Sequence, residues 1–263
     1  MRDTKEPATA RTLLERILAS GTVEDEHGNV LPLRYSNVSV EEGRSIAACI
    51  ERHGFERTLE VGCAYGISAL YICDAISRRP NPHHVMIDPL ESTRWRNIGI
   101  RNLRDAGFGF WELLEEPSAL ALPSLVQKNV KVQFALIDGW HTFDQTLLDF
   151  FYVDKLLDDG GIVAIDDVAM PAINRVVRYA LNYPTYRVVE TVNAGAARES
   201  PPAHRALGLL MRGLARLVPT GARELYFTDS CLRPSKEAAL TCDMIFLQKS
   251  GPDARPWDWY KAF

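Results

Sequence analysis

The sequence predicts a doubly wound α/β fold built on a seven-stranded, Rossmann-like sheet. From Thr58 onward, short apolar segments alternate with helical segments, which is typical of parallel strands joined by crossover helices. Acidic residues follow several of the apolar segments, where the strands of an open α/β sheet end. We expect strands over Thr58–Val61, His84–Ile87, Phe110–Leu114, Phe134–Ile137, Ile162–Ile165, Tyr186–Thr191 and Met244–Gln248.

The segments between these strands have the apolar spacing of amphipathic helices. Two further helices precede the first strand. Thr9–Ser20 ends before Gly21, and the other begins after Ser39, which forms a capping box with Glu42. A polar turn over 24–29 separates them. We therefore expect an N-terminal helical cap over 1–55 and a ligand-binding domain over 56–263, with helices at Ser68–Ile76, Arg94–Asp105, Ser118–Gln127, Thr142–Leu157 and Ile173–Asn182.

Residues 193–242 form a long insertion before the last predicted strand. Within it, Ala206–Leu217 has leucines at helical spacing beside Arg205, Arg212 and Arg216. One interpretation is an ordinary amphipathic helix packed on the edge of the sheet. The other is a lid or a dimer arm that shapes the binding pocket. The sequence leaves both open.

The composition is that of an ordinary soluble globular protein. Of 263 residues, 46% are hydrophobic and 24% are charged, and no apolar segment approaches the roughly 18 residues that span a bilayer. The net charge of −4 argues against a general nucleic-acid binder. Five cysteines without metal-ligand spacing indicate a reducing compartment. We therefore expect a cytoplasmic protein with no nucleic-acid or membrane partner, and a homodimer as the default assembly.

The segment Leu59–Leu70 carries the strongest ligand-binding pattern. A predicted strand ends just after Glu60, a loop with Gly62 and Gly66 follows, and a helix begins near Ser68. Glycines allow close backbone approach to a ligand, and the helix N-terminus offers free N–H groups to an anionic group. A dinucleotide-binding turn would have the spacing GxGxxG, so this loop disfavours a nicotinamide cofactor. It suits a nucleoside ligand that carries a carboxylate but no pyrophosphate.

Carboxylates follow three other predicted strands. Asp88 stands where a carboxylate can accept hydrogen bonds from the two hydroxyls of a ribose, although it could instead cap a turn before Pro89. Asp138 and the pair Asp166 and Asp167 follow two later strands. Their convergence at one edge would be repulsive unless a cation such as magnesium offset it. Alternatively, Asp166 and Asp167 cap the next helix and Asp138 alone orients the cofactor.

Residues 58–182 resemble the class I S-adenosylmethionine-dependent methyltransferases. More narrowly, they resemble the small-molecule O-methyltransferases that include catechol O-methyltransferase and the macrolide-sugar O-methyltransferases. The resemblance lies in the loop that opens with Glu60, in Asp88, and in the strings Asp138-Gly139-Trp140-His141 and Asp166-Asp167. About half of the chain is covered by these ordered motifs.

The resemblance implies a role for each motif. The loop around Gly62 would meet the methionine part of S-adenosylmethionine, Ser68 its carboxylate, Asp88 the ribose, and Trp140 the adenine. Asp138 would be the first metal ligand. The implied cofactor-binding residues are Glu60, Gly62, Ala64, Tyr65, Gly66, Ser68, Asp88, Ser118, Asp138 and Trp140, and the implied ligands of Mg²⁺ or another divalent cation are Asp138, Asp166 and Asp167.

Two positions depart from the family pattern. His141 stands where the family has a catalytic lysine, and Pro117 replaces an acid that would approach the adenine, although Ser118 can still donate a hydrogen bond. Methyl transfer is an in-line displacement, so the acceptor hydroxyl must be aligned and must lose its proton. We expect the cation to lower the pKa of that hydroxyl, and His141 to take the proton, since an imidazole of near-neutral pKa suits a general base. His141 and Asp138 are therefore the expected catalytic residues. Alternatively, a histidine in the first turn of a helix is a solvated cap or a partner of the site residues.

The sequence thus predicts an enzyme that transfers a methyl group from S-adenosylmethionine to a hydroxyl of a small-molecule acceptor, with a divalent cation. A metal-independent N- or O-methyltransferase of the same fold is one alternative. Another is a degenerate fold that binds the cofactor or a partner without catalysis, which the joint presence of Glu60, Gly62, Gly66, Asp88 and Asp138 disfavours. The sequence does not identify the acceptor.

Overall fold

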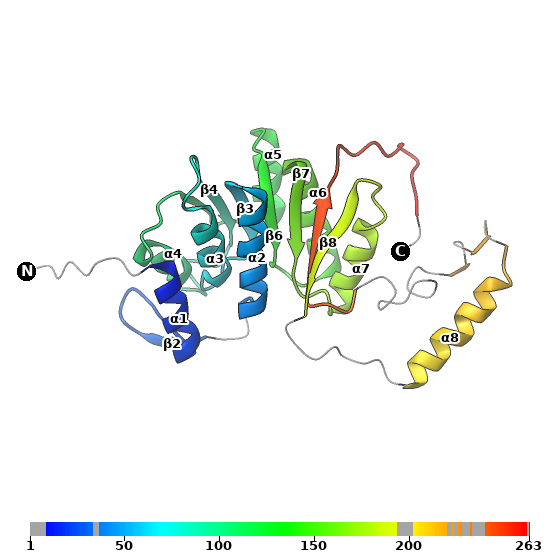
Figure 1. The fold of residues 1–263 in the computed structure, drawn as a ribbon, viewed down its shortest axis with the longest axis horizontal. Coiled ribbons are helices and arrows are strands. Elements are labelled where there is room, and N and C mark those ends of the chain that lie inside the picture. The colour runs from blue at the N-terminus through cyan, green and yellow to red at the C-terminus, as the bar shows by residue number, and fades with distance from the viewer. Residues whose placement is uncertain are drawn as a thin grey trace, which may run out of the picture.

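The computed structural model of the chain describes residues 9–33, 37–193, 202–219, 222–223, 226–227, 232, 240–261 and 263 (Figure 1). A seven-stranded sheet with the order β5-β4-β3-β6-β7-β9-β8 lies at its centre, with helices on both faces. This confirms the predicted doubly wound, Rossmann-like architecture. The strands are β3 (Arg57–Val61), β4 (His83–Ile87), β5 (Trp111–Leu114), β6 (Val132–Ile137), β7 (Leu157–Ile165), β8 (Tyr186–Val192) and β9 (Met244–Lys249).

The order of the strands fixes where a ligand can bind. The neighbours from β5 to β7 pair in parallel, whereas β9 is antiparallel to both β7 and β8. The chain leaves β3 toward β4 on one side and later enters β6 on the other side of β3, so the winding reverses between β3 and β6. Such a reversal opens a crevice outside the carboxyl ends of the strands, which is where open α/β sheets bind ligands.

Two apolar cores lie on the two faces of the sheet, because successive side chains of a strand point to opposite faces. Leu59 and Val61 of β3 belong to one core, and the buried Thr58 and Glu60 face the other way. The first core is covered by α5 (Ser118–Gln127), α6 (Phe143–Leu156) and α7 (Pro171–Ala180). The second is covered by α1 (Ala10–Ser20), α2 (Val40–His53), α3 (Ile67–Ile76) and α4 (Ile98–Asp105).

The N-terminal segment packs on the second core rather than beside it. Helices α1 and α2 both contact α3, and their apolar side chains share one buried cluster with the strands. Ser39 and Glu42 form the expected capping box. The polar turn is present, but it joins β1 (Thr22–Glu24) and β2 (Val30–Pro32), which were not predicted because strands of 3 residues are too short to show an alternating pattern. That residues 1–55 act as a cap stays a prediction.

Helix α4 begins at Ile98 and not at Arg94 as expected. The carbonyl of Leu90 accepts hydrogen bonds from successive backbone N–H groups, including that of Arg94, and so closes a turn. Arg96 and Asn97 then both have a φ of 56°, which interrupts a right-handed helix. The apolar spacing of this segment therefore belongs partly to a turn.

Glu91 is a buried carboxylate that caps α4. Its Oε1 accepts a hydrogen bond from the N–H of Ile100 at 3.2 Å, while Asn97, the N-cap residue, makes no side-chain cap bond. Its Oε2 has no partner among the described residues. Burial raises the pKa of Glu91 to about 8, because the charged form is poorly solvated there.

Helix α8 (Pro202–Arg216) lies in the insertion and stands apart from the sheet in Figure 1. Leu207, Leu210, Leu214 and Leu217 are all exposed. The simpler expectation, a helix packed on the sheet edge, is therefore wrong, because the leucines that would make that contact face solvent. The role of a lid or a dimer arm stays a prediction. Within the described ranges, none of the helices combines the length and apolar character needed to cross a bilayer.

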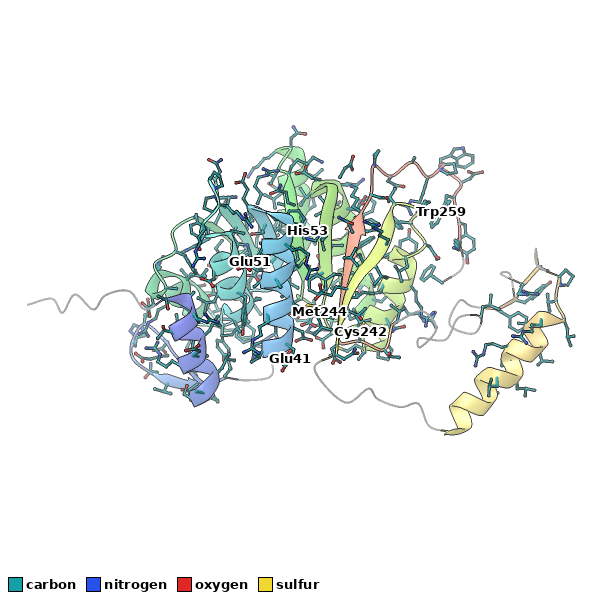
Figure 2. All side chains as sticks on the ribbon, viewed as in Figure 1. Glu41, Glu51, His53, Cys242, Met244 and Trp259 are labelled. Carbon is teal, nitrogen blue, oxygen red and sulfur yellow. The ribbon has the colours of Figure 1, made fainter. Side chains whose placement is uncertain are left out.

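The C-terminal segment folds back beside the end of α7. Trp259 lies on this segment (Figure 2). Its ring is edge-on to Tyr179 and Tyr183, with centroids 6.5 and 6.2 Å apart. Phe263 also packs against Tyr179, at 5.0 Å between centroids. Trp257, in contrast, is 97% exposed. Trp259 and Phe263 are therefore docked on the protein, whereas Trp257 contacts solvent.

Trp259→Ala should destabilise the chain by about 1–3 kcal/mol, because it removes a large ring and its edge-on aromatic contacts. Denaturant unfolding measures this change. Trp257→Ala is the matched control and should stay within about 0.5 kcal/mol of the native chain, since its ring contacts solvent. Equal effects of the two substitutions would contradict the docked arrangement of the tail.

Glu91→Gln should stabilise the chain more at alkaline than at acidic pH. The pKa of Glu91 rises on folding from 4.5 to about 8, so its contribution is most favourable below pH 4.5 and is lost as the pH rises through 8. Glutamine cannot ionise. The difference in unfolding free energy between variant and native chain should therefore grow by about 1–3 kcal/mol between about pH 5.5 and about pH 8.5. A difference that is independent of pH would show that Glu91 ionises as an ordinary carboxyl.

Candidate functional site

A pocket of about 880 Å³ opens at the carboxyl edge of the sheet, where the winding reverses. Its wall comes from the loop after β3, the ends of β4, β6 and β7, the start of α5 and the N-terminal segment. Glu60, Tyr65 and Gly66 do not line it. The predicted site residues that do are Gly62, Ala64, Ser68, Asp88, Ser118, Asp138, Trp140, His141, Asp166 and Asp167.

Gly62 lets two strand ends meet. Its φ is 93°, and a Cβ atom there would overlap the carbonyl oxygen of Asp138 and lie 2.8 Å from the carbonyl carbon. The N–H of Gly62 donates to the carbonyl of Ile87, and the N–H of Asp138 donates to that of Val61, both at 2.9 Å. Gly66, with a φ of 72°, then starts α3. The absence of side chains at these glycines brings the loop to the mouth of the pocket.

Asp88 holds this loop in place. Its Oδ2 accepts hydrogen bonds from the N–H groups of Cys63 at 3.1 Å and Ala64 at 2.9 Å. Its Oδ1 accepts one from Leu90 at 2.9 Å, so the turn-capping role considered for Asp88 is present. The carboxylate also lines the pocket, and its remaining lone pairs can accept further hydrogen bonds. The predicted contact with a ribose is compatible with this arrangement.

Glu60 lies fully buried beneath the loop. Its Oε2 accepts a hydrogen bond from Oγ of Ser68 at 2.7 Å, and its Oε1 lies 3.2 Å from Nε2 of His84. Nδ1 of His84 is in turn 2.9 Å from Oγ1 of Thr58. This chain of hydrogen bonds ties the start of α3 to β3. Glu60 can therefore affect a cofactor only through Ser68 and the loop.

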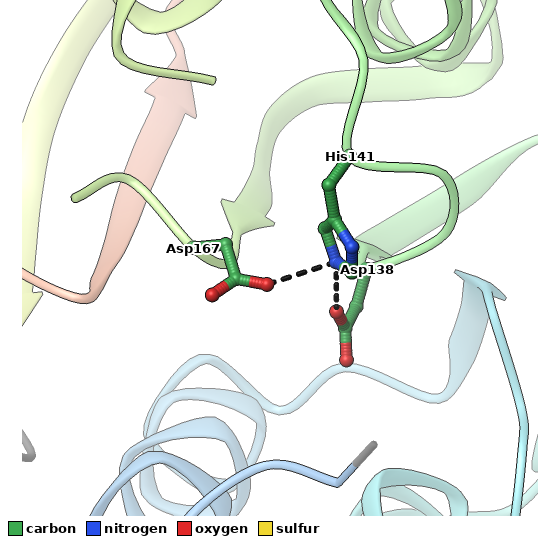
Figure 3. A group of neighbouring side chains, drawn as sticks. All are labelled: Asp138, His141 and Asp167. Atoms are coloured by element: carbon green, nitrogen blue, oxygen red, sulfur yellow. Dashed lines mark hydrogen bonds and ion pairs between the residues drawn. The ribbon is translucent and has the colours of Figure 1, made fainter. Parts of the chain in front are cut away.

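Asp138, His141 and Asp167 form a compact group in the pocket (Figure 3). Nε2 of His141 lies 2.8 Å from Oδ2 of Asp167 and 3.4 Å from Oδ1 of Asp138. One possible ligand atom of each residue lies within 4.8 Å of the others. Hydrogen bonds to Asp138 and then to Asp167 raise the pKa of His141 to about 10. This pKa lies above the near-neutral value expected from the sequence, because the two carboxylates favour the imidazolium form.

Asp166 also lines the pocket but is not part of this group of three. Its Oδ1 accepts a hydrogen bond from the N–H of Asp167 at 2.8 Å. Burial, together with the charges of Asp138 and Glu42, raises the pKa of Asp166. The structure thus groups His141 with Asp138 and Asp167, whereas the resemblance implies Asp166 as the third ligand.

Ser118 and Trp140 contribute the part of the wall that follows β5 and β6. Ser118 is the first residue of α5, and it is half-buried. Trp140 is 63% exposed, and its carbonyl accepts a hydrogen bond from Oγ1 of the buried Thr146 at 3.1 Å. The indole of Trp140 is therefore open to a ligand, while its backbone is held by α6.

Part of the pocket wall comes from residues that no sequence motif indicates. Asn37, Val38 and Glu42 reach it from the N-terminal segment, and Arg94 and Asp243 reach it from loops. The packing of α2 on α3 brings the first three there, and no local motif encodes that contact. The capping box accounts for Glu42 in the sequence, so nothing there indicates that it also lines the pocket.

Comparison with known proteins adds a family match and a set of similar folds. Residues 59–168 match a family model described as a methyltransferase domain. A search of curated proteins finds no match. The O-methyltransferase TomG from Streptomyces achromogenes, solved in complex with SAM, is 19% identical with a TM-score of 0.54, and the match covers 73% of this chain and 86% of TomG.

Two further solved structures agree. The O-methyltransferase from Bacillus cereus, in complex with SAH, is 18% identical with a TM-score of 0.55, over 72% of this chain and 88% of that one. The SAH-bound methyltransferase PaMTH1 from Podospora anserina is 16% identical with a TM-score of 0.54, over 70% and 82%. The chain therefore has the fold of the class I S-adenosylmethionine-dependent methyltransferases, and its residues 59–168 match the model of a methyltransferase domain.

Proposed function

We propose that the chain is an S-adenosylmethionine-dependent methyltransferase that methylates a hydroxyl of a small-molecule acceptor with the help of a divalent cation. One observation carries the proposal: a single pocket contains both the glycine loop with Asp88 and the group formed by Asp138, His141 and Asp167. Methyl transfer needs a nucleoside site and, within reach of it, groups that make an oxygen nucleophilic. The similar folds of two O-methyltransferases support the same conclusion.

In the proposed cofactor site, the methionine part of the cofactor lies on the loop at Gly62 and Ala64. The hydroxyl of Ser68 already donates to Glu60, so we assign the contact with the cofactor carboxylate to the free backbone N–H groups at the start of α3. Asp88 accepts from the ribose hydroxyls. Ser118 and Trp140 frame the adenine, and Tyr65 and Gly66 support the loop from behind.

The side chains of Asp138, His141 and Asp167 fit a divalent cation. Asp138 and Asp167 offer carboxylate oxygens and His141 an imidazole nitrogen, all directed at one another. Such a mixed donor set admits manganese, iron or zinc as well as magnesium. Asp166 is adjacent and can add an oxygen. When bound, the cation would supply Lewis-acid polarisation of the acceptor oxygen.

His141 and Asp138 are the proposed catalytic residues. Nε2 of His141 must first lose the proton that it shares with the two carboxylates. It can then accept the proton of the acceptor hydroxyl, provided that the cation is held by Asp138, Asp166 and Asp167 and not by Nε2 itself. Asp138 and Asp167 stabilise the imidazolium that forms. This stabilisation strengthens His141 as a base, for the same reason that it raises the pKa of His141.

A metal-independent methyltransferase is the second candidate, and one observation favours it. The imidazolium of His141 already lies between Asp138 and Asp167, so the group has a positive charge of its own.

The N-terminal segment is our proposed cap for the acceptor, because Asn37 and Val38 line the pocket. A cytoplasmic location and a homodimer stay expectations from the composition.

Calorimetric titration with S-adenosylhomocysteine should show saturable one-to-one binding, with and without EDTA, because the cofactor site is formed by the chain itself. Methylation of hydroxylated acceptors should stop in EDTA and return when a divalent cation is added. Activity that persists in EDTA would select the metal-independent candidate. Failure to bind S-adenosylhomocysteine would refute the proposed function.

His141→Ala should lower turnover by about 10², the usual effect of losing a general base, while S-adenosylhomocysteine still binds. Turnover at saturating acceptor is the quantity to measure. His27→Ala is the matched control, since His27 is exposed in the β1–β2 turn. Full turnover in the His141 variant would remove this residue from the mechanism.

A further inference from the structure

Glu42 is a buried carboxylate at the start of α2 that reaches the pocket. It is 6% exposed and lines the pocket beside Asn37 and Val38. Its Oε2 accepts a hydrogen bond from the N–H of Ser39 at 2.7 Å, which completes the capping box. Its Oε1 makes no hydrogen bond or ion pair with any residue that the structure describes. The cap therefore uses one oxygen of Glu42, and the other can accept from a ligand.

Helix α2 places Glu42 over the half of the pocket that lies away from the proposed nucleoside site. The helix contacts both α3 and β8, and its buried side chains share one apolar cluster with β6, β7 and β9. It therefore crosses the face of the sheet above these three strands, whereas the glycine loop and Asp88 follow β3 and β4. Asp138, Asp166 and Asp167 follow β6 and β7. Glu42 thus lines the part of the pocket in which the acceptor is proposed to bind.

Carboxylates outnumber cationic side chains in this half of the pocket. The acids that line it are Glu42, Asp138, Asp166, Asp167 and Asp243. Among the described residues of the pocket wall, the cationic side chains are those of His141 and Arg94, and Arg94 follows β4, with its guanidinium over the ring of Trp95 at 4.8 Å. A divalent cation held by Asp138, Asp166 and Asp167 would offset two of the negative charges. The wall therefore stays negative at Glu42 after such a cation binds.

A protonated amine is the chemical group that fits Oε1 of Glu42 best. A buried carboxylate is unfavourable unless a hydrogen-bonded charge offsets it. A hydroxyl could donate to Oε1 but brings no charge, and an anionic group would be repelled by Glu42 and Asp166. An ammonium group donates an N–H and also offsets the charge. An acceptor held at both ends, by the cation and by Glu42, would also have a fixed orientation, which an in-line transfer requires.

We propose that the acceptor is a hydroxylated amine, and that Glu42 binds it through a hydrogen bond and ion pair between Oε1 and the protonated nitrogen. The inference rests on the proposed function, because it assumes that a hydroxyl held near Asp138, His141 and Asp167 receives the methyl group. Glu42 takes no part in the transfer itself. It selects the acceptor by charge and orients it.

The experiment compares acceptors that share a skeleton and differ in charge. One set is a catechol with an aminoethyl, an ethyl or a carboxymethyl group at the same ring position, and the other is glucosamine, glucose and glucuronate. The quantity to measure is kcat/KM for methylation, together with the Kd for the chain loaded with S-adenosylhomocysteine and a divalent cation. Within a set that binds, the native chain should prefer the amine over the neutral compound by about tenfold or more, which is the usual effect of a hydrogen bond between charged groups. The carboxylate should bind least well.

Two neighbouring substitutions separate the contact with the acceptor from the cap and from the net charge. Glu42→Gln removes the charge but keeps the capping box, because glutamine at this position accepts the same hydrogen bond from Ser39. The preference for the amine should fall to about one in this variant. Glu41→Gln is the matched control, since it removes the same charge from an exposed position in the same turn, and it should keep the native preference. Thermal unfolding verifies that each variant is folded.

Each other result overturns the inference. A folded Glu42→Gln that keeps the native preference shows that Glu42 is a cap only, and an equal loss in Glu41→Gln shows that only the net charge matters. A native chain that does not favour the amines, or that binds S-adenosylhomocysteine but neither amine, overturns the inference as well, and this comparison decides alone should Glu42→Gln not fold. All of these results leave the cofactor site standing. Failure of the native chain to bind S-adenosylhomocysteine overturns the proposed function, and the inference with it.

Discussion

The contact between the backbones of Gly62 and Asp138 is the constraint on which the site depends. It joins the end of β3 to the end of β6 across the point where the winding reverses, and the N–H of Asp138 donates to the carbonyl of Val61 there at 2.9 Å. Gly139 continues the close approach, since a Cβ atom on it would lie 2.9 Å from Cγ1 of Val61. The loop proposed to bind the cofactor and the acidic group proposed to activate the acceptor are therefore attached to the same rigid junction. Methyl transfer needs such a fixed separation, because its two reacting atoms must meet in line.

Carboxylates dominate this edge of the sheet, and each is accommodated differently. Asp88 is satisfied by backbone N–H groups, and Glu60 by Ser68 and His84. Asp138 and Asp167 share the imidazole of His141. Burial nevertheless raises the pKa of Asp138 to about 6, and burial with the charges of Asp138 and Glu42 raises that of Asp166. The pocket therefore contains acids whose charge is unfavourable to folding, a pattern more typical of binding and catalytic sites than of structural cores.

The sequence was sufficient to predict the sheet and most of the loop chemistry, because both are encoded locally. Glu60, Gly62 and Gly66 sit in one short segment, and Asp88 and Asp138 each follow an apolar strand. Contacts that form only through tertiary packing could not be predicted from the sequence. Glu42 is a capping residue in the sequence, and only the packing of α2 on α3 brings it to the pocket. The start of α4 was misplaced for a related reason: an apolar spacing does not reveal that Arg96 and Asn97 adopt positive φ.

The histidine at position 141 changes the chemistry of the acidic group in a way that a lysine would not. An ammonium group is a permanent donor, so it can neutralise Asp138 and Asp167 but cannot ligate a cation. Nε2 of His141 can do either, because the neutral imidazole has a lone pair where the imidazolium has a proton. Nε2 faces both carboxylates, at 2.8 Å from Oδ2 of Asp167 and 3.4 Å from Oδ1 of Asp138. A proton and a cation therefore compete for the same atom, and whichever is bound supplies the positive charge that the two carboxylates require. The affinity of this group for a cation must then fall as the pH falls, because each cation that binds has to displace the proton of His141.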